Sequence, residues 1–148
     1  MDHVERAKEL FFKGYNCAQS VFAAFSDVTG IDEDTAIKLT SGFGAGMGAL
    51  REVCGAVTGM FMVADMLYGY TSPTDAKGKA AHYELIRELA EEFKAENDSI
   101  ICRELIASCS KGRKPMERTD EYYGVRPCTR FVADAAAILD RKIAEMQK

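Results

Sequence analysis

Apolar residues recur along this chain at the three- and four-residue spacing of a helix, and the two-residue alternation of a strand is almost absent. The pattern and its breaks predict helices over residues 2–13, 17–27, 32–40, 51 or 54 to 68, 74–96, 101–107 and 127–146. We therefore expect an all-α fold, an irregular bundle of about six or seven helices. Nothing in the pattern marks a boundary, so residues 1–148 are expected to form a single domain.

Polar residues and glycines mark where these helices begin and end. Gly14 follows the first helix, and Asn16 is placed to cap the second. Asp32 is a cap of the same kind, and Pro127 suits the first turn of the last helix. Residues 108–126 are polar and contain glycine and proline, so we predict a long loop there.

A glycine-rich segment, Gly42–Gly48, separates two of the predicted helices. It lacks the Gly-Lys-Ser/Thr ending of a P-loop, and no strand precedes it as in a dinucleotide-binding turn. Alternate glycines allow positive φ angles and a close approach of the backbone to a neighbouring group. Two interpretations stay open: a tight turn between packed helices, or a cover over a functional site.

Four of the five cysteines lie where a predicted helix begins: Cys17, Cys54, Cys102 and Cys128. A helix N-terminus has unpaired N–H groups and about half a positive charge, and both favour thiolate over thiol. The sequence therefore predicts a site that holds sulfur as an anion. Cys109 follows the short helix predicted over 101–107, and it is either incidental or a resolving thiol.

The cysteine spacing leaves the chemistry of this site open. No CxxC or CxxCH is present, which argues against a zinc ribbon, a thioredoxin motif and covalent c-type haem. Four thiolates suit structural zinc and suit [2Fe–2S] or [4Fe–4S] clusters equally well. Neighbouring residues that are placed to contact a bound cofactor are Gly44, Gly46, Gly48, Arg51, Glu52 and Gly55.

Composition and charge argue against several classes of function. A net charge of −4 and a pI near 5.3 argue against a nucleic-acid partner. The most apolar run, 53–67, contains Asp65 and is shorter than the roughly 20 residues of a membrane span, so we expect no membrane partner. No signal peptide is visible, so we expect a cytoplasmic protein whose cysteines bind metal or are redox-active. The two histidines, His3 and His82, are expected on the surface.

Several motifs together are similar to those of a known family. They are Gly14–Ser20, Gly42–Gly48, Glu52–Gly59, Cys102–Leu105 and Cys128. In this combination the chain resembles the redox-active protein family named for its C_GCAxxG_C_C cysteine pattern, although it reads Cys54-Gly55-Ala56 where the name has Gly-Cys-Ala. The resemblance implies a small helical protein with its family cysteines at 17, 54, 102 and 128, and it gives Cys109 no place. A related domain in split-Soret cytochromes is associated with an iron–sulfur centre.

Three functional hypotheses follow. The first is a redox protein whose four cysteines hold an iron–sulfur cluster, [2Fe–2S] foremost, for electron transfer or sensing. The second is a metal-free thiol–disulfide oxidoreductase that uses pairs such as Cys17–Cys54 and Cys102–Cys128. The third is a helical binding module with a structural four-cysteine zinc site. A redox partner protein fits the first two, and the apolar content permits a homodimer.

Overall fold

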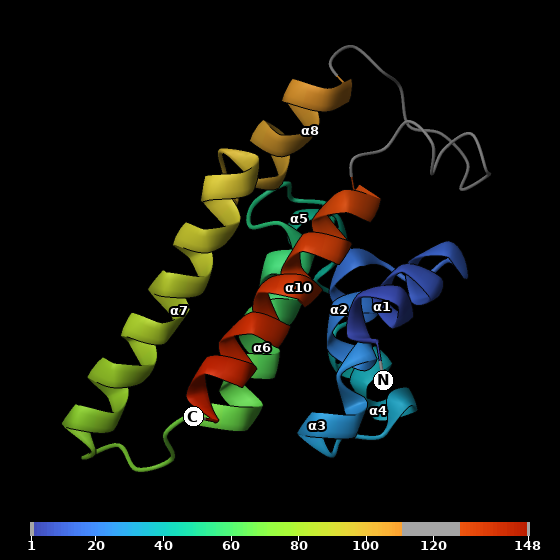
Figure 1. The fold of residues 1–148 in the computed structure, drawn as a ribbon. Helices are drawn as coiled ribbons and strands as arrows, with labels where there is room; N and C mark the ends of the chain where they lie inside the picture. Colours follow the sequence, from blue (N-terminus) through green and yellow to red (C-terminus); the bar gives the residue numbers. More distant parts are fainter. Residues whose placement is uncertain (1, 111–127, 148) are drawn as a thin grey trace.

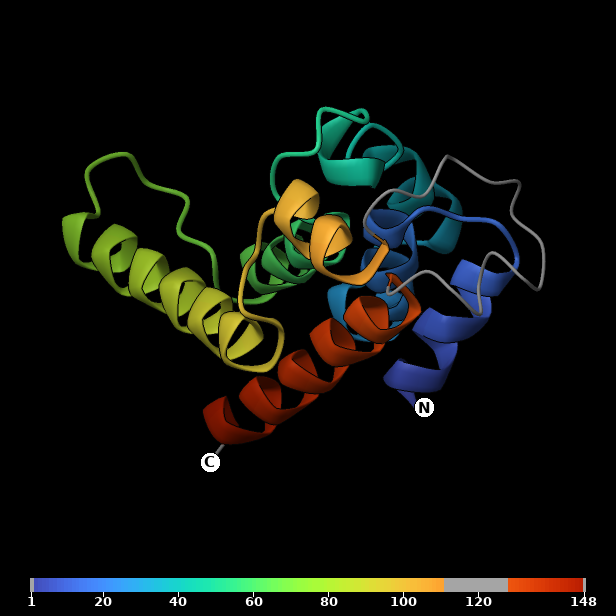
Figure 2. The same ribbon diagram turned by 90° about the horizontal axis from the view of Figure 1, so that it is seen from above.

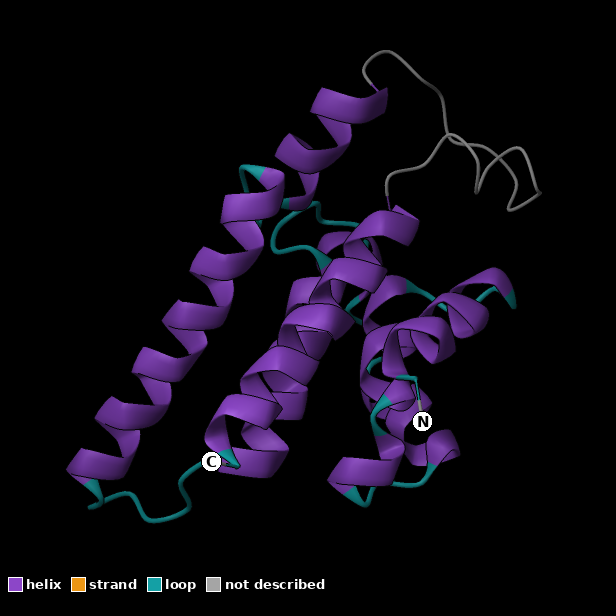
Figure 3. Ribbon diagram, viewed as in Figure 1, coloured by secondary structure: helices purple, strands orange, loops and turns teal. Residues whose placement is uncertain are grey.

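The computed structural model describes residues 2–110 and 128–147, apart from the side chains of 108–110, and these residues are almost entirely helical (Figures 1 and 3). The helices are α1 (His3–Phe12), α2 (Cys17–Ala24), α3 (Ser26–Thr29), α4 (Glu33–Leu39), α5 (Gly44–Met47), α6 (Gly55–Tyr68), α7 (Ala76–Asn97), α8 (Cys102–Ser110) and α10 (Cys128–Met146). Over the described ranges no strand occurs, and one isolated antiparallel bridge joins Val53 to Ile101. The predicted all-α fold is confirmed. None of the helices in these ranges is long and apolar enough to cross a membrane.

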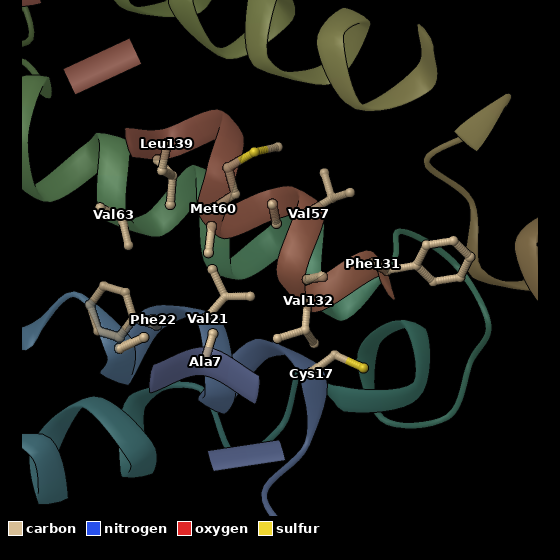
Figure 4. Close-up of a cluster of buried hydrophobic side chains, with 14 of the residues drawn as sticks. Ala7, Cys17, Val21, Phe22, Val57, Met60, Val63, Phe131, Val132 and Leu139 are labelled. Atoms are coloured by element: carbon tan, nitrogen blue, oxygen red, sulfur yellow. The ribbon is translucent and has the colours of Figure 1, made fainter. Parts of the chain in front are cut away.

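The core lies where α2, α6 and α10 meet, with α1 covering α2 and α10. Helix α6 is apolar on nearly all sides, so it can bury residues against several neighbours at once. Figure 4 shows Val21 and Phe22 of α2 next to α6 in this core, with the Val63 side chain of α6 pointing toward Phe22. The helices α2 and α6 approach closely at Gly59, because a Cβ there would lie 2.9 Å from the Ala18 carbonyl oxygen.

The long helix α7 lies on the outer side of the bundle, which Figure 2 shows most clearly. It packs on α6 and α10 through a narrow stripe that includes Leu85, Leu89 and Phe93. The Phe93 ring lies 5.9 Å from the Phe131 ring of α10, measured between centroids. Lys142 of α10 adds ion pairs to glutamates of α7. The remaining surface of α7 is largely charged, as expected for an outer helix.

Some predicted boundaries are wrong. The helix expected over 17–27 ends at Ala24, because Phe25 leaves the helical region with φ −102° and ψ 20°, and the separate short helix α3 follows. The helix expected over 101–107 continues to Ser110, so the predicted loop cannot begin at 108. The rest of that loop, 111–126, lies outside the described residues.

The expectation that the histidines lie on the surface is wrong for His82, and His3 is partly buried. The His82 side chain is buried, and its Nε2 lies 2.6 Å from a carboxylate oxygen of Asp65. The His3 ring stacks on Phe25 at 4.1 Å, and its two nitrogens contact Asp140 and Asp27. Each imidazole contacts a carboxylate from another part of the chain, a pairing that helical spacing alone does not reveal.

Candidate functional site

The four cysteines singled out by the sequence all lie at helix N-termini, as predicted. Cys17, Cys102 and Cys128 are the first residues of α2, α8 and α10, and Cys54 is the N-cap of α6. Each is 5–8% exposed, so all four side chains are buried. The N–H groups that a helix leaves unpaired in its first turn therefore lie near each of the four cysteines.

All four cysteines line one cavity of about 280 Å³. One water molecule occupies about 30 Å³ in the liquid, so the cavity has room for a group of several atoms. Four of the other residues proposed to contact a cofactor also line it: Gly44, Gly46, Arg51 and Gly55. Among the residues that the structure describes, Gly48 and Glu52 are not part of the cavity lining.

A short antiparallel pairing brings Cys54 and Cys102 together. The Cys54 N–H donates to the Ile100 carbonyl at 2.8 Å, and the Cys102 N–H donates to the Glu52 carbonyl at 2.6 Å. The bridged pair, Val53 and Ile101, lies between these bonds. Because side chains alternate along paired segments, Cys54 and Cys102 share the face opposite to the bridged pair. Two cysteines far apart in sequence thus become diagonal neighbours.

The beginning of α2 is fixed beside the beginning of α6 by a capping box and a glycine. The Asn16 side chain accepts the Gln19 N–H at 2.8 Å, and the Gln19 side chain accepts the Asn16 N–H at 3.0 Å. At Gly55 an added Cβ would lie 3.2 Å from the Cys17 Cβ and 3.0 Å from the Phe43 carbonyl oxygen. A larger residue at 55 would push Cys17 away from Cys54 in the adjoining turn.

Replacing Asn16 with alanine is expected to lower the free energy of unfolding by about 1 kcal/mol, because α2 loses its N-cap. Urea unfolding monitored by circular dichroism measures this change. The Asn16→Asp variant keeps a capping oxygen and serves as the control, since it should stay close to wild type. Equal losses in the two variants would contradict a capping role.

The glycine-rich segment forms a left-handed turn over Cys102. Residues 45–49 have consecutive φ angles between 54° and 70°. At Gly46 a Cβ would lie 2.7 Å from the Cys102 Cβ and 2.7 Å from the Arg51 Cα. Glycine at 46 therefore allows the backbone to lie directly against the cysteine. The segment is both a tight turn and a cover over this part of the cavity.

The charges at the site are unevenly placed. The Arg51 guanidinium donates from Nη1 to the Cys102 Sγ at 3.7 Å. Arg103, the next residue in α8, instead pairs with the Glu52 carboxylate at 3.1 Å and donates to the Arg51 carbonyl at 3.2 Å. Glu52 thus has a structural partner beside the site, whereas Arg51 contacts a sulfur atom.

Burial raises the pKa of the Cys54 thiol to about 12. The N–H groups of Val57 and Ala56 act in the opposite direction, and the neighbouring Cys128 and Cys102 raise the pKa slightly further. A thiol with such a pKa is almost entirely protonated at neutral pH and is a poor nucleophile. Metal binding is the process that would remove this proton.

In metal-free protein, Cys54 is expected to react with iodoacetamide at pH 8 roughly 1000-fold more slowly than an ordinary exposed cysteine. Its rate should rise about tenfold for each pH unit, because only the thiolate attacks and its fraction grows in that proportion well below the pKa. Mass spectrometry of the Cys54 peptide measures the rate. Guanidinium-unfolded protein is the control and should react at the ordinary rate. Rapid alkylation of the folded protein at pH 7 would contradict this assignment.

Some lining residues carry no sequence signal of their own. Phe11 and Phe131 line the cavity, but their positions are those of ordinary core residues on α1 and α10. Ser41 and Ala49 lie beside the glycines, and only the folded loop turns them toward the cysteines. The side chain of Cys109 lies outside what the structure describes.

The four cysteines line the cavity without forming the ligand group of a single metal ion. In residues 2–110 and 128–147, no three cysteine, histidine or acidic side chains form a group able to hold one metal ion. The donor set is nevertheless that of an iron–sulfur cluster, namely four cysteines around a space larger than an ion. The cavity of about 280 Å³ that these four cysteines line gives such a group room, so the residues fit it.

Comparison with known protein families gives a match over most of the chain. The family model described as "Putative redox-active protein (C_GCAxxG_C_C)" covers residues 15–142. No curated protein and no solved structure matches the chain. The matched region contains the four cysteines around the cavity and the glycine-rich turn that covers Cys102. Since this match spans most of the sequence, the chain belongs to the C_GCAxxG_C_C family.

Proposed function

We propose that Cys17, Cys54, Cys102 and Cys128 hold an iron–sulfur cluster, foremost [2Fe–2S]. The protein uses this cluster for electron transfer or for sensing. The observation that carries this proposal is the lining of one cavity by these four buried cysteines. Membership of a family described as redox-active agrees with it. When bound, such a cluster supplies reversible one-electron chemistry.

The chain's own residues prepare the site for sulfur as an anion. Four helix N-termini direct partial positive charge toward the cavity, and each contributes roughly 0.3–1 kcal/mol for a nearby negative charge. This is well below the cost of ionising a buried thiol such as Cys54, whose pKa is about 12. The protein therefore orients the thiols, and a bound metal has to supply the remaining stabilisation.

The geometry argues against one possible disulfide, between Cys54 and Cys102. Cys54 and Cys102 are diagonal neighbours across the short antiparallel pairing, a relation that separates Cα atoms by about 7–8 Å. Disulfides need a Cα separation of at most about 7 Å. The Cα atoms of Cys54 and Cys102 are therefore at or beyond the limit for a disulfide, whereas two ligands of a cluster need no such close approach.

Anaerobic purification, followed by iron, zinc and acid-labile sulfide analysis and a visible spectrum, tests the proposal. We expect iron and sulfide in the wild-type protein, and their loss when any one of the four site cysteines is replaced with serine. Cys109→Ser is the matched control, because Cys109 has no place in the family pattern, and this variant should keep the cluster. Zinc without sulfide would support a structural site instead, and metal-free protein with reversible cysteine pairing would support thiol–disulfide exchange.

A further inference from the structure

One positively charged side chain, that of Arg51, contacts the sulfur of one of the four cysteines. Arg51 lines the cavity, and its Nη1 donates to the Sγ of Cys102 at 3.7 Å. Cys102 is 6% exposed, and its contact with Arg51 is partly buried. A guanidinium stays protonated at every pH that the protein survives. Cys102 therefore has a permanent positive charge beside its sulfur.

The backbone holds Arg51 in a conformation that arginine rarely adopts. Its φ angle is 61°, in the left-handed region where a side chain is unfavourable and glycine is preferred. The Arg51 N–H donates to the Ala45 carbonyl at 3.3 Å, and the Arg51 carbonyl accepts the Arg103 N–H at 3.3 Å. Residues in such conformations concentrate at functional sites, where surrounding bonds maintain them. The side chain itself is thus the reason to look for a role at this position.

We infer that Arg51 raises the reduction potential of the group that the four cysteines bind, acting through the Cys102 sulfur; this rests on the proposed function. Reduction takes one electron from a one-electron donor, makes or breaks no bond, and adds one negative charge to a site that already has four thiolates. The guanidinium stabilises that added charge, so it favours the reduced form. Hydrogen bonds to sulfur and local charge are among the factors that set cluster potentials. Arg51 is a positioning residue in this role, because its partner is the ligand sulfur.

Arg103 provides the control that separates this contact from a general effect of positive charge. It directly follows Cys102 and carries the same guanidinium group. Its Nη1 is held by Glu52 at 3.1 Å and by the Arg51 carbonyl at 3.2 Å. Removing either arginine takes one positive charge from the same region, but of the two it is the Arg51 guanidinium that contacts the Cys102 sulfur.

The experiment compares Arg51→Gln, Arg51→Lys and Arg103→Gln with the wild type. Each protein is purified without oxygen, and its cluster is titrated with dithionite while the visible absorbance is recorded. We expect Arg51→Gln to lower the equilibrium constant for reduction at least tenfold, which equals 59 mV for a one-electron couple. Arg103→Gln should shift it less than half as far on the mV scale, and Arg51→Lys should lie between Arg51→Gln and wild type. Glutamine meets the same left-handed backbone requirement as arginine, so the variant tests the side chain.

The outcomes separate this inference from the proposed function. Wild-type protein without iron and sulfide would overturn both. A wild-type cluster whose potential does not change in Arg51→Gln, or changes equally in Arg103→Gln, would overturn the role of Arg51 and leave the cluster in place. Should Arg51→Gln lose the cluster, the potential of Arg51→Lys decides, and a value equal to wild type would overturn the inference.

Discussion

Replacing Gly46 with alanine is expected to lower the free energy of unfolding by about 3 kcal/mol or more and to abolish retention of a group bound by the cysteines. A Cβ at this position would lie 2.7 Å from both the Arg51 Cα and the Cys102 Cβ, and 2.8 Å from the Glu52 nitrogen. Two of these three atoms are backbone, so they cannot move aside as the end of a flexible side chain does. The left-handed turn and the Cys102 side chain must therefore separate.

Gly30→Ala is the matched control for this prediction. Gly30 also has a positive φ, 77° against 70° at Gly46, but an added Cβ there meets nothing within 4 Å. The Gly30→Ala variant thus has the destabilisation of about 1–2 kcal/mol that a side chain causes in the left-handed region, but it has no steric clash. Urea unfolding of the two variants, together with iron analysis of the folded fractions, measures the difference. A Gly46→Ala protein as stable as Gly30→Ala would show that the turn does not press on Cys102.

Replacing Phe131 with alanine is expected to lower the free energy of unfolding by about 3–5 kcal/mol. The ring is 1% exposed and packs against the Phe93 ring at 5.9 Å, so its removal leaves a void in the core. Total stabilities of about 5–15 kcal/mol are usual, so this loss is a large share. Phe131 also lines the cysteine cavity, and we therefore expect faster iron loss to a chelator from the folded variant.

Phe93→Ala separates the two effects of that substitution. Phe93 is equally buried, but it belongs to α7 and does not line the cavity in the described part of the chain. Its stability loss should match that of Phe131→Ala, while the rate of iron loss from folded protein should stay near the wild-type value. If both variants released iron at the same rate, the contribution of Phe131 to the cavity wall would be disproved.

Much of the fold could be predicted because local chemistry determines helix ends. Asn16 and Asp32 cap α2 and α4 as the sequence indicates, and the stripe that includes Phe131 and Val132 is buried on α10. The same local signals place four cysteines at helix N-termini. Capping and periodicity depend only on residues a few positions apart, so both can be read from the chain itself.

The arrangement of the site could not be predicted, because it depends on contacts between distant segments. The pairing around Val53 and Ile101 is a single bridge, which is too short to produce any two-residue alternation. The contact from Arg51 to Cys102 depends on that pairing and on a left-handed arginine. Glycines in the turn indicated conformational freedom, but they did not reveal that Ala45 and Met47 adopt positive φ angles as well.

The antiparallel pairing of 51–54 with 100–103 also has a consequence for the order in which the protein matures. The cavity uses residues from α1 to α10, so during synthesis its last wall emerges only when the start of α10 has left the ribosome. Contacts between such distant segments form late, because long loops must close first. Any group that requires all four thiols would then be acquired after folding, and by mass action it would favour the completed fold over partly folded chains. Cofactor content would thus report how much of a preparation has finished folding.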